Sequence, residues 1–111
     1  TQDTLLPSTE SILRDFLVGQ EWLRAHGMDQ EPRLAYFPDS FGHSPALPSL
    51  LRGAGFDRTI VGRIDGGYFV GADWESPRRF PRPGSGAETL VRAGSADFIW
   101  RDGNGAEVLA H

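Results

Sequence analysis

Two residues of opposite charge, Asp39 and Arg63, each follow a short apolar segment that is typical of a β-strand. Asp39 comes one proline after the segment 33–37, and Arg63 comes one glycine after the segment 59–61. If these strands are parallel neighbours, about 4.8 Å apart, the carboxylate and the guanidinium lie within hydrogen-bonding reach at one edge. An arginine partner keeps a carboxylate ionised, which is the state that a nucleophile or a metal ligand requires. Two structural alternatives stay open: Asp39 caps a helix that begins near Ser44, or the pair is an ordinary surface ion pair.

The residues around this pair predict a strand, a helix and a second strand. The segment 33–37 is apolar and aromatic and is bounded by prolines, as expected for a buried strand. Ser44 and Pro45 are typical of a helix start, although Pro48 leaves the start open by one turn, and leucines at helical spacing continue until Gly55. Residues 33–63 therefore have the length and order of a βαβ unit, in which the two strands are parallel.

The flanking sequence predicts a helix, a loop and a hairpin. Residues 8–26 have apolar positions at three- and four-residue spacing between a serine N-cap and a C-terminal glycine, which predicts a helix. Residues 64–95 are interrupted by glycines and prolines and are predicted to form a long loop, with 87–91 as the one candidate element. Two short strands joined by an Asp-Gly-Asn-Gly turn predict a hairpin over residues 97–110.

The composition restricts the classes of protein that the chain can represent. With 111 residues it is too short for two independent cores, and 11 Lys and Arg against 15 Asp and Glu give a net charge of −4. This charge argues against nucleic-acid and anionic-membrane partners, both of which need a basic face. Because there is no cysteine, any metal must be bound by His, Asp or Glu. No apolar run reaches the length of a transmembrane helix, so we expect a soluble protein.

Both ends of the chain read as interrupted, with Thr1 at the start and a strand still in progress at the end. We therefore expect residues 1–111 to be a single fragment of a longer polypeptide rather than a complete small domain.

One segment has a specific pattern, Phe37-Pro38-Asp39-Ser40-Phe41-Gly42-His43-Ser44-Pro45. Together with Leu47-Pro48, Gly55-Phe56 and Gly62-Arg63 downstream, it resembles the catalytic domain of the zinc-dependent retaining α-mannosidases, which include lysosomal, Golgi and bacterial enzymes. The resemblance runs in order along nearly the whole chain, and residues 65–95 are its least similar part.

The resemblance implies a role for three residues. Asp39 matches the aspartate that attacks the anomeric carbon and also binds zinc. Phe41 matches an aromatic residue that lines the mannose subsite, and Arg63 matches an arginine near the nucleophile. His43 is interpreted as a turn residue and not as a metal ligand. The family's other zinc ligands and its acid/base carboxyl have no counterpart in these 111 residues.

The expected fold is therefore α/β, a partial parallel sheet with flanking helices that forms a fragment of a seven-stranded α/β barrel. The expected function is part of a glycosidase that cleaves terminal α-mannosyl residues from a mannosyl glycan or mannoside, together with the remainder of its catalytic domain. The fragment by itself is expected to be inactive. The alternative is a noncatalytic carbohydrate-binding or scaffolding piece derived from such an enzyme. The compartment stays open, a bacterial cytoplasm being one option.

Overall fold

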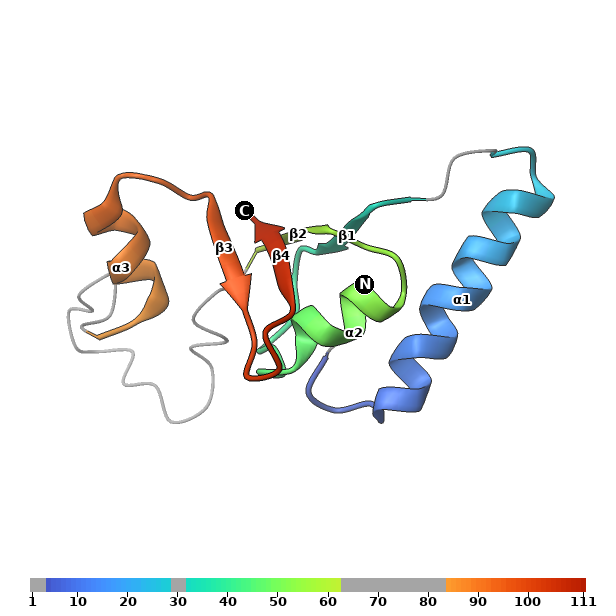
Figure 1. Ribbon diagram of the computed structural model, residues 1–111, viewed down its shortest axis with the longest axis horizontal. Helices are drawn as coiled ribbons and strands as arrows, with labels where there is room; N and C mark the ends of the chain where they lie inside the picture. The colour runs from blue at the N-terminus through green and yellow to red at the C-terminus, as the bar shows by residue number, and fades with distance from the viewer. Residues whose placement is uncertain (1–3, 29–31, 63–83) are drawn as a thin grey trace, which may run out of the picture.

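The computed structural model describes residues 4–28, 32–62 and 84–111. Four strands form one mixed sheet in the order β1-β2-β4-β3, and the described residues also form helices α1, α2 and α3 (Figure 1). The strands β1, β2 and β4 are parallel, and β3 pairs antiparallel with β4. The bounds in chain order are α1 Thr9–Ala25, β1 Leu34–Phe37, α2 Leu47–Gly53, β2 Arg58–Val61, α3 Gly86–Ala93, β3 Phe98–Arg101 and β4 Glu107–Ala110.

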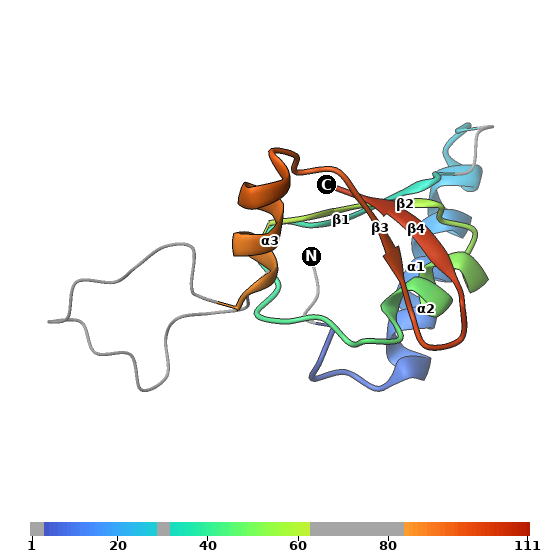
Figure 2. The same ribbon diagram turned by 60° about the vertical axis from the view of Figure 1, so that its left-hand side comes forward.

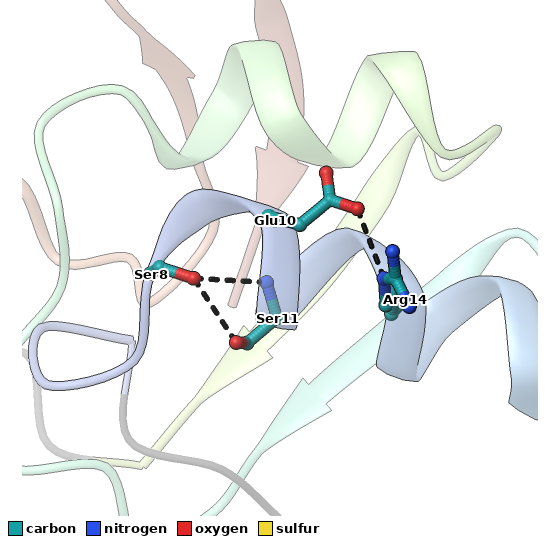
Figure 3. A network of polar contacts seen from close by, with 4 residues as sticks. All are labelled: Ser8, Glu10, Ser11 and Arg14. Carbon is teal, nitrogen blue, oxygen red and sulfur yellow. Dashed lines mark hydrogen bonds and ion pairs between the residues drawn. The ribbon is translucent and has the colours of Figure 1, made fainter.

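Helix α1 begins and ends where the sequence predicts. The Ser8 hydroxyl accepts a hydrogen bond from the Ser11 backbone N–H at 3.2 Å, and Glu10 pairs with Arg14 one turn later (Figure 3). The serine satisfies one of the backbone donors left unpaired at the start of a helix. At the other end Gly27 has a φ of 82°, the left-handed conformation that glycine adopts without steric cost.

The predicted βαβ unit is confirmed, with parallel β1 and β2 and with Phe37 opposite Val61 in the register. Helix α2 begins at Leu47, within the one turn after Pro45 that Pro48 left open. Its N-cap is Ala46, because Ser44 to Ala46 form a turn in which the Ser44 hydroxyl accepts the Ala46 N–H at 3.2 Å. Pro48 then occupies the first helical turn, where a missing N–H costs nothing.

The hydrophobic core lies between one face of the sheet and the two helices α1 and α2, which Figure 2 shows on the same side of the strands. Phe37 of β1 is 2% exposed, and Leu47 and Leu51 of α2 are fully buried. Phe16 of α1 contacts Phe37 edge-on, with ring centroids 6.3 Å apart, and also contacts Phe56. Burial of these apolar surfaces holds β1 against α1 and α2.

The opposite face of the sheet is exposed within the part of the chain that the structure describes. Strand β1 alternates exposed and buried residues, so Leu34 and Tyr36 point away from the helices. The predicted strand is thus buried on the side that α1 and α2 cover, and its other side is exposed within the described residues. The seven-stranded barrel stays a prediction, since the sheet described here has four strands.

The hairpin predicted over 97–110 is confirmed as β3 and β4. It is tied to α2 by Asp102, whose carboxylate accepts the backbone N–H groups of Asn104 and Ala106 in the turn and of Ser49 in the helix. The Ser49 hydroxyl also donates to this carboxylate. The turn residue therefore fixes both its own loop and the position of the hairpin on α2.

The long loop predicted over 64–95 is corrected at its end, where α3 spans Gly86–Ala93. Ser85 caps this helix by accepting the Glu88 N–H at 3.1 Å, and Gly94 ends it with a φ of 67°. Both signals were present in the sequence, but the surrounding glycines and prolines favoured a loop. The earlier part of the predicted loop, 64–83, lies outside the described residues.

Candidate functional site

The candidate site lies at the edge where β1 and β2 both end. Phe37 and Val61 are register partners, and the Gly62 N–H donates to the Phe37 carbonyl at 2.9 Å. Pro38 and Asp39 directly follow β1, and Gly62 directly follows β2. The predicted convergence of the two chain segments at one edge is thus confirmed for the backbone. Arg63 lies outside the described residues, so its pairing with Asp39 stays a prediction.

Asp39 is exposed, whereas the next residue, Ser40, is buried at 3% exposure. Asp39 does not occupy the N-cap position of α2, because that position belongs to Ala46 and the preceding turn is formed by Ser44.

A residue far upstream holds the loop that follows Asp39. Thr4 is buried, and its hydroxyl donates to the Gly42 carbonyl at 3.0 Å and lies 3.3 Å from Nδ1 of His43. Gly42 has a φ of 150°, which a residue with a side chain rarely adopts. This contact joins positions 38 residues apart, and no local pattern in the sequence could have identified Thr4.

His43 lies between two aromatic rings, edge-on to Phe37 at 5.8 Å and to Trp100 at 5.7 Å between ring centroids. It lines an open pocket of about 240 Å³ together with Val61, Phe98 and Trp100. This environment is that of a packed loop residue, and the interpretation of His43 as a turn residue and not a metal ligand stays a prediction.

Phe41 lies two residues beyond Asp39 on the anchored loop and is 47% exposed. Nearly half of this side chain is therefore accessible on the same loop as the carboxylate. Exposed aromatic faces of this kind bind the apolar faces of ligands. Phe37, by contrast, is buried in the core and cannot contact a ligand directly.

The sequence places Gly62 at the end of a predicted strand and gives no other sign that the position matters. A Cβ atom built on it would overlap the carbonyl oxygen of Pro38 and lie 2.9 Å from the carbonyl carbon. The backbones after β1 and β2 thus approach each other more closely at this point than a side chain permits.

Asp39 is the residue to which the resemblance assigns zinc binding. Over residues 4–28, 32–62 and 84–111, no three or more His, Asp or Glu side chains lie together so that they could hold an ion. Asp39 is an exposed residue with a carboxylate and fits as one oxygen ligand. A complete site would take its other ligands from outside these ranges.

Residues 1–111 match the N-terminal domain of glycosyl hydrolases family 38, and the chain belongs to this family. The alpha-mannosidase of Saccharomyces cerevisiae is 27% identical over 109 residues, and alpha-mannosidase 2C1 of Homo sapiens is 30% identical over 111 residues. Each alignment covers 98% of this chain and 8% of the relative, so the chain spans about a twelfth of their length. A putative mannosylglycerate hydrolase of Halalkalibacterium halodurans is 37% identical over 62 residues, 56% of this chain and 7% of that protein.

None of the helices in the described ranges is both long enough and apolar enough to cross a membrane.

Proposed function

We propose that this chain is the nucleophile-bearing part of a retaining glycoside hydrolase that removes terminal α-mannosyl residues from a mannosyl glycan or mannoside. The observation that carries the proposal is the exposed carboxyl group of Asp39 at the carboxyl edge of β1, in a chain of glycosyl hydrolases family 38. In α/β sheets this edge is where ligands bind, because the loops diverge there. The alpha-mannosidase relatives support the choice of sugar.

In the proposed reaction a carboxylate oxygen of Asp39 attacks the anomeric carbon while the bond from that carbon to the leaving oxygen breaks. The leaving oxygen takes a proton from a carboxylic acid that lies outside the described residues. Water then attacks the anomeric carbon of the Asp39 ester, gives its proton to the same acid/base group and releases the sugar. Two inversions give net retention.

The proposal assigns supporting roles to the two neighbouring residues. Phe41, with its exposed ring on the loop of Asp39, would pack against the apolar face of the sugar. Arg63 would keep the Asp39 carboxyl group ionised, because an adjacent cation stabilises the charged form. Both roles follow from the resemblance and from the position of these residues in the chain.

Asp39 would also be one ligand of a zinc ion whose remaining ligands lie outside the described residues. When bound, such an ion would act as a Lewis acid that holds the sugar hydroxyls and fixes the ring. The described residues would contribute to zinc binding by holding Asp39 on a loop that Thr4 anchors at Gly42.

The test is the substitution Asp39→Asn in the intact protein, followed with an aryl α-mannoside and with a 2-fluoro-mannosyl reagent that traps the covalent ester. We expect turnover to be abolished and the labelled peptide containing Asp39 to disappear from the mass spectrum. The matched control is Asp15→Asn, which changes another exposed aspartate, on α1. If the Asp39→Asn protein is still labelled, Asp39 is not the nucleophile.

The isolated 111 residues are proposed to be inactive, because retention needs a second carboxyl group about 5 Å from the nucleophile. Catalytic zinc also needs about three protein ligands. Isothermal titration of the isolated chain with zinc is expected to give no tight one-to-one binding. Tight stoichiometric binding would contradict this proposal while leaving the role of Asp39 open to the labelling test.

A second candidate substrate is a mannosylated small molecule. The relative from Halalkalibacterium halodurans, which has 37% identity over 62 residues, carries this candidate. Comparing kcat/KM for mannosylglycerate and for an aryl α-mannoside distinguishes the two. A preference for mannosylglycerate would favour the second candidate, and binding of either compound without turnover would favour a noncatalytic carbohydrate-binding role.

A further inference from the structure

The backbone at Gly62 is in close contact with the peptide unit that leads into Asp39. The Gly62 N–H donates to the Phe37 carbonyl at 2.9 Å, which extends the pairing of β1 and β2 by one residue. The Cα of Gly62 then faces the Pro38 carbonyl, and a Cβ placed there would overlap its oxygen and lie 3.2 Å from the Pro38 Cα.

The requirement for glycine at this position is one of space. Gly62 does not belong to the glycines with a positive φ, so its backbone conformation is open to other residues. By contrast, Gly53 at the end of α2 has no atom within 4 Å of its hypothetical Cβ. The two glycines therefore differ in their surroundings and form a matched pair for substitution by alanine.

A displacement of the Pro38 carbonyl would be transmitted to Asp39. The Pro38 C=O and the Asp39 N–H belong to one planar peptide unit, so they move together. Phe37, on the upstream side, is buried in the core and hydrogen-bonded within the sheet, and the proline ring fixes the φ of Pro38. The Pro38 peptide therefore cannot move far on the side of Phe37, and its displacement moves Asp39 instead.

We propose that Gly62 is a positioning residue for Asp39: by letting the chain after β2 lie against the Pro38 peptide, it sets where the Asp39 carboxyl group stands at the sheet edge. The proposal rests on the proposed function, in which Asp39 is the nucleophile. Gly62 itself has no side chain that could contact the substrate. Its effect on the reaction is through the placement of the attacking oxygen.

The experiment compares Gly62→Ala with Gly53→Ala in the intact protein, using the rate of labelling by the 2-fluoro-mannosyl reagent and steady-state kinetics with an aryl α-mannoside. A shift of the nucleophile by about 1 Å predicts a loss of roughly 100-fold in the labelling rate and in kcat for Gly62→Ala. The loss is expected to be larger in kcat than in KM, because the substitution acts on the placement of the attacking oxygen and removes no side chain that contacts the sugar. Gly53→Ala is expected to behave as the wild type in both measurements.

A merely structural role for Gly62 would give a different pattern. The Gly62→Ala protein would then label at the wild-type rate while folded and would differ only in its melting temperature, which would overturn the proposal. Loss of activity in Asp39→Asn together with wild-type labelling in Gly62→Ala would overturn the positioning role alone. Retained labelling in Asp39→Asn would instead overturn the proposed function.

If Gly62→Ala does not fold, Pro38→Gly tests the same peptide unit without adding an atom. Removing the ring frees the φ of Pro38 and loosens the peptide that carries the Asp39 nitrogen. We expect the labelling rate to fall on the order of tenfold, since the nucleophile spends less time in the attacking geometry. A wild-type labelling rate in this folded variant would overturn the proposal.

Discussion

Asp39 and Asp102 both follow a strand by one or two residues, yet the fold uses them in opposite ways. Asp39 lies at the carboxyl edge of the parallel strands and is exposed. Because β3 is antiparallel, Asp102 after its end lies at the amino edge, where it is 8% exposed and accepts hydrogen bonds from the turn and from α2. The two aspartates thus differ in exposure according to the edge of the sheet at which they lie, the carboxyl edge being the one where ligands bind in α/β sheets.

Hydrogen bonds within the fold stabilise the charged form of Asp102, the aspartate at the amino edge. The Ser49 hydroxyl lowers the pKa of Asp102 below its ordinary value of 3.8, burial opposes the shift, and the backbone N–H groups of Ala106, Asn104 and Ser49 add to the lowering. The charged form of Asp102 is thus the one that the folded chain stabilises. Because the Asp102 carboxylate already accepts these hydrogen bonds from the protein, it has few acceptor positions left for a ligand.

The strongest test of the comparison is to replace each of the two aspartates by asparagine. We expect Asp39→Asn to reduce kcat/KM by roughly 10⁴-fold or more, since in the proposed function a carboxylate oxygen of Asp39 is the attacking atom. Its effect on stability is expected to stay within about 0.5 kcal/mol, as for other surface substitutions. Asp102→Asn is expected to leave kcat/KM close to the wild-type value at temperatures where the protein is folded. A comparable loss of turnover in both variants would break the distinction between the two edges.

A second test compares the two phenylalanines on either side of Asp39. Phe37→Ala removes a buried ring from the core and is expected to destabilise the protein by about 3–5 kcal/mol. Phe41→Ala is expected to change stability by no more than about 0.5 kcal/mol, because that ring is 47% exposed, and to raise KM for the mannoside. Denaturant unfolding and steady-state kinetics on both variants are the measurements. An unchanged KM in Phe41→Ala would remove Phe41 from the sugar site.

A third test uses pH at the amino edge. Because the pKa of Asp102 is lower in the folded chain than its ordinary 3.8, its contribution to stability is present above that value and is lost as the pH falls through the lowered pKa. Hydrogen exchange of the Asn104 and Ala106 amides is therefore expected to be slower in the wild type than in Asp102→Asn at neutral pH. The difference should shrink as the pH falls below 3.8. A difference that is independent of pH would show that the charge of Asp102 does not hold the turn.

The smallest expected effect lies at the start of α1, far from both aspartates. Ser8→Ala removes the N-cap hydrogen bond to Ser11 and is expected to cost about 1 kcal/mol of stability. Turnover at temperatures where the protein is folded should not change. Thr9→Ala, at the first helical residue, is the control. Any change in kcat for Ser8→Ala would indicate that α1 influences the Asp39 loop beyond the contact made by Thr4.

Much of the fold could be predicted, because the signals are local. Ser8, Gly27 and Gly55 mark helix ends through the conformations that single residues prefer, and the two short β-branched or aromatic segments identify β1 and β2. The sequence left the start of α2 open by one turn, and the structure places it at Leu47, since Ser44 forms a turn before the helix instead of its N-cap. Helix α3 was predicted only in part, because glycines and prolines around it weakened a correct capping signal at Ser85.

The sequence by itself determined the local elements, the parallel βαβ unit and the place of Asp39 after the first strand, since each depends on residues within a few positions of one another. Tertiary structure alone decided that β4 inserts between β2 and β3, that Thr4 anchors Gly42, that Ser49 binds Asp102 and that Gly62 lies against Pro38. These contacts join residues 24 to 53 positions apart. Which residues meet in these contacts depends on how the helices and the sheet pack. Tertiary packing of this kind leaves no periodic pattern in the sequence.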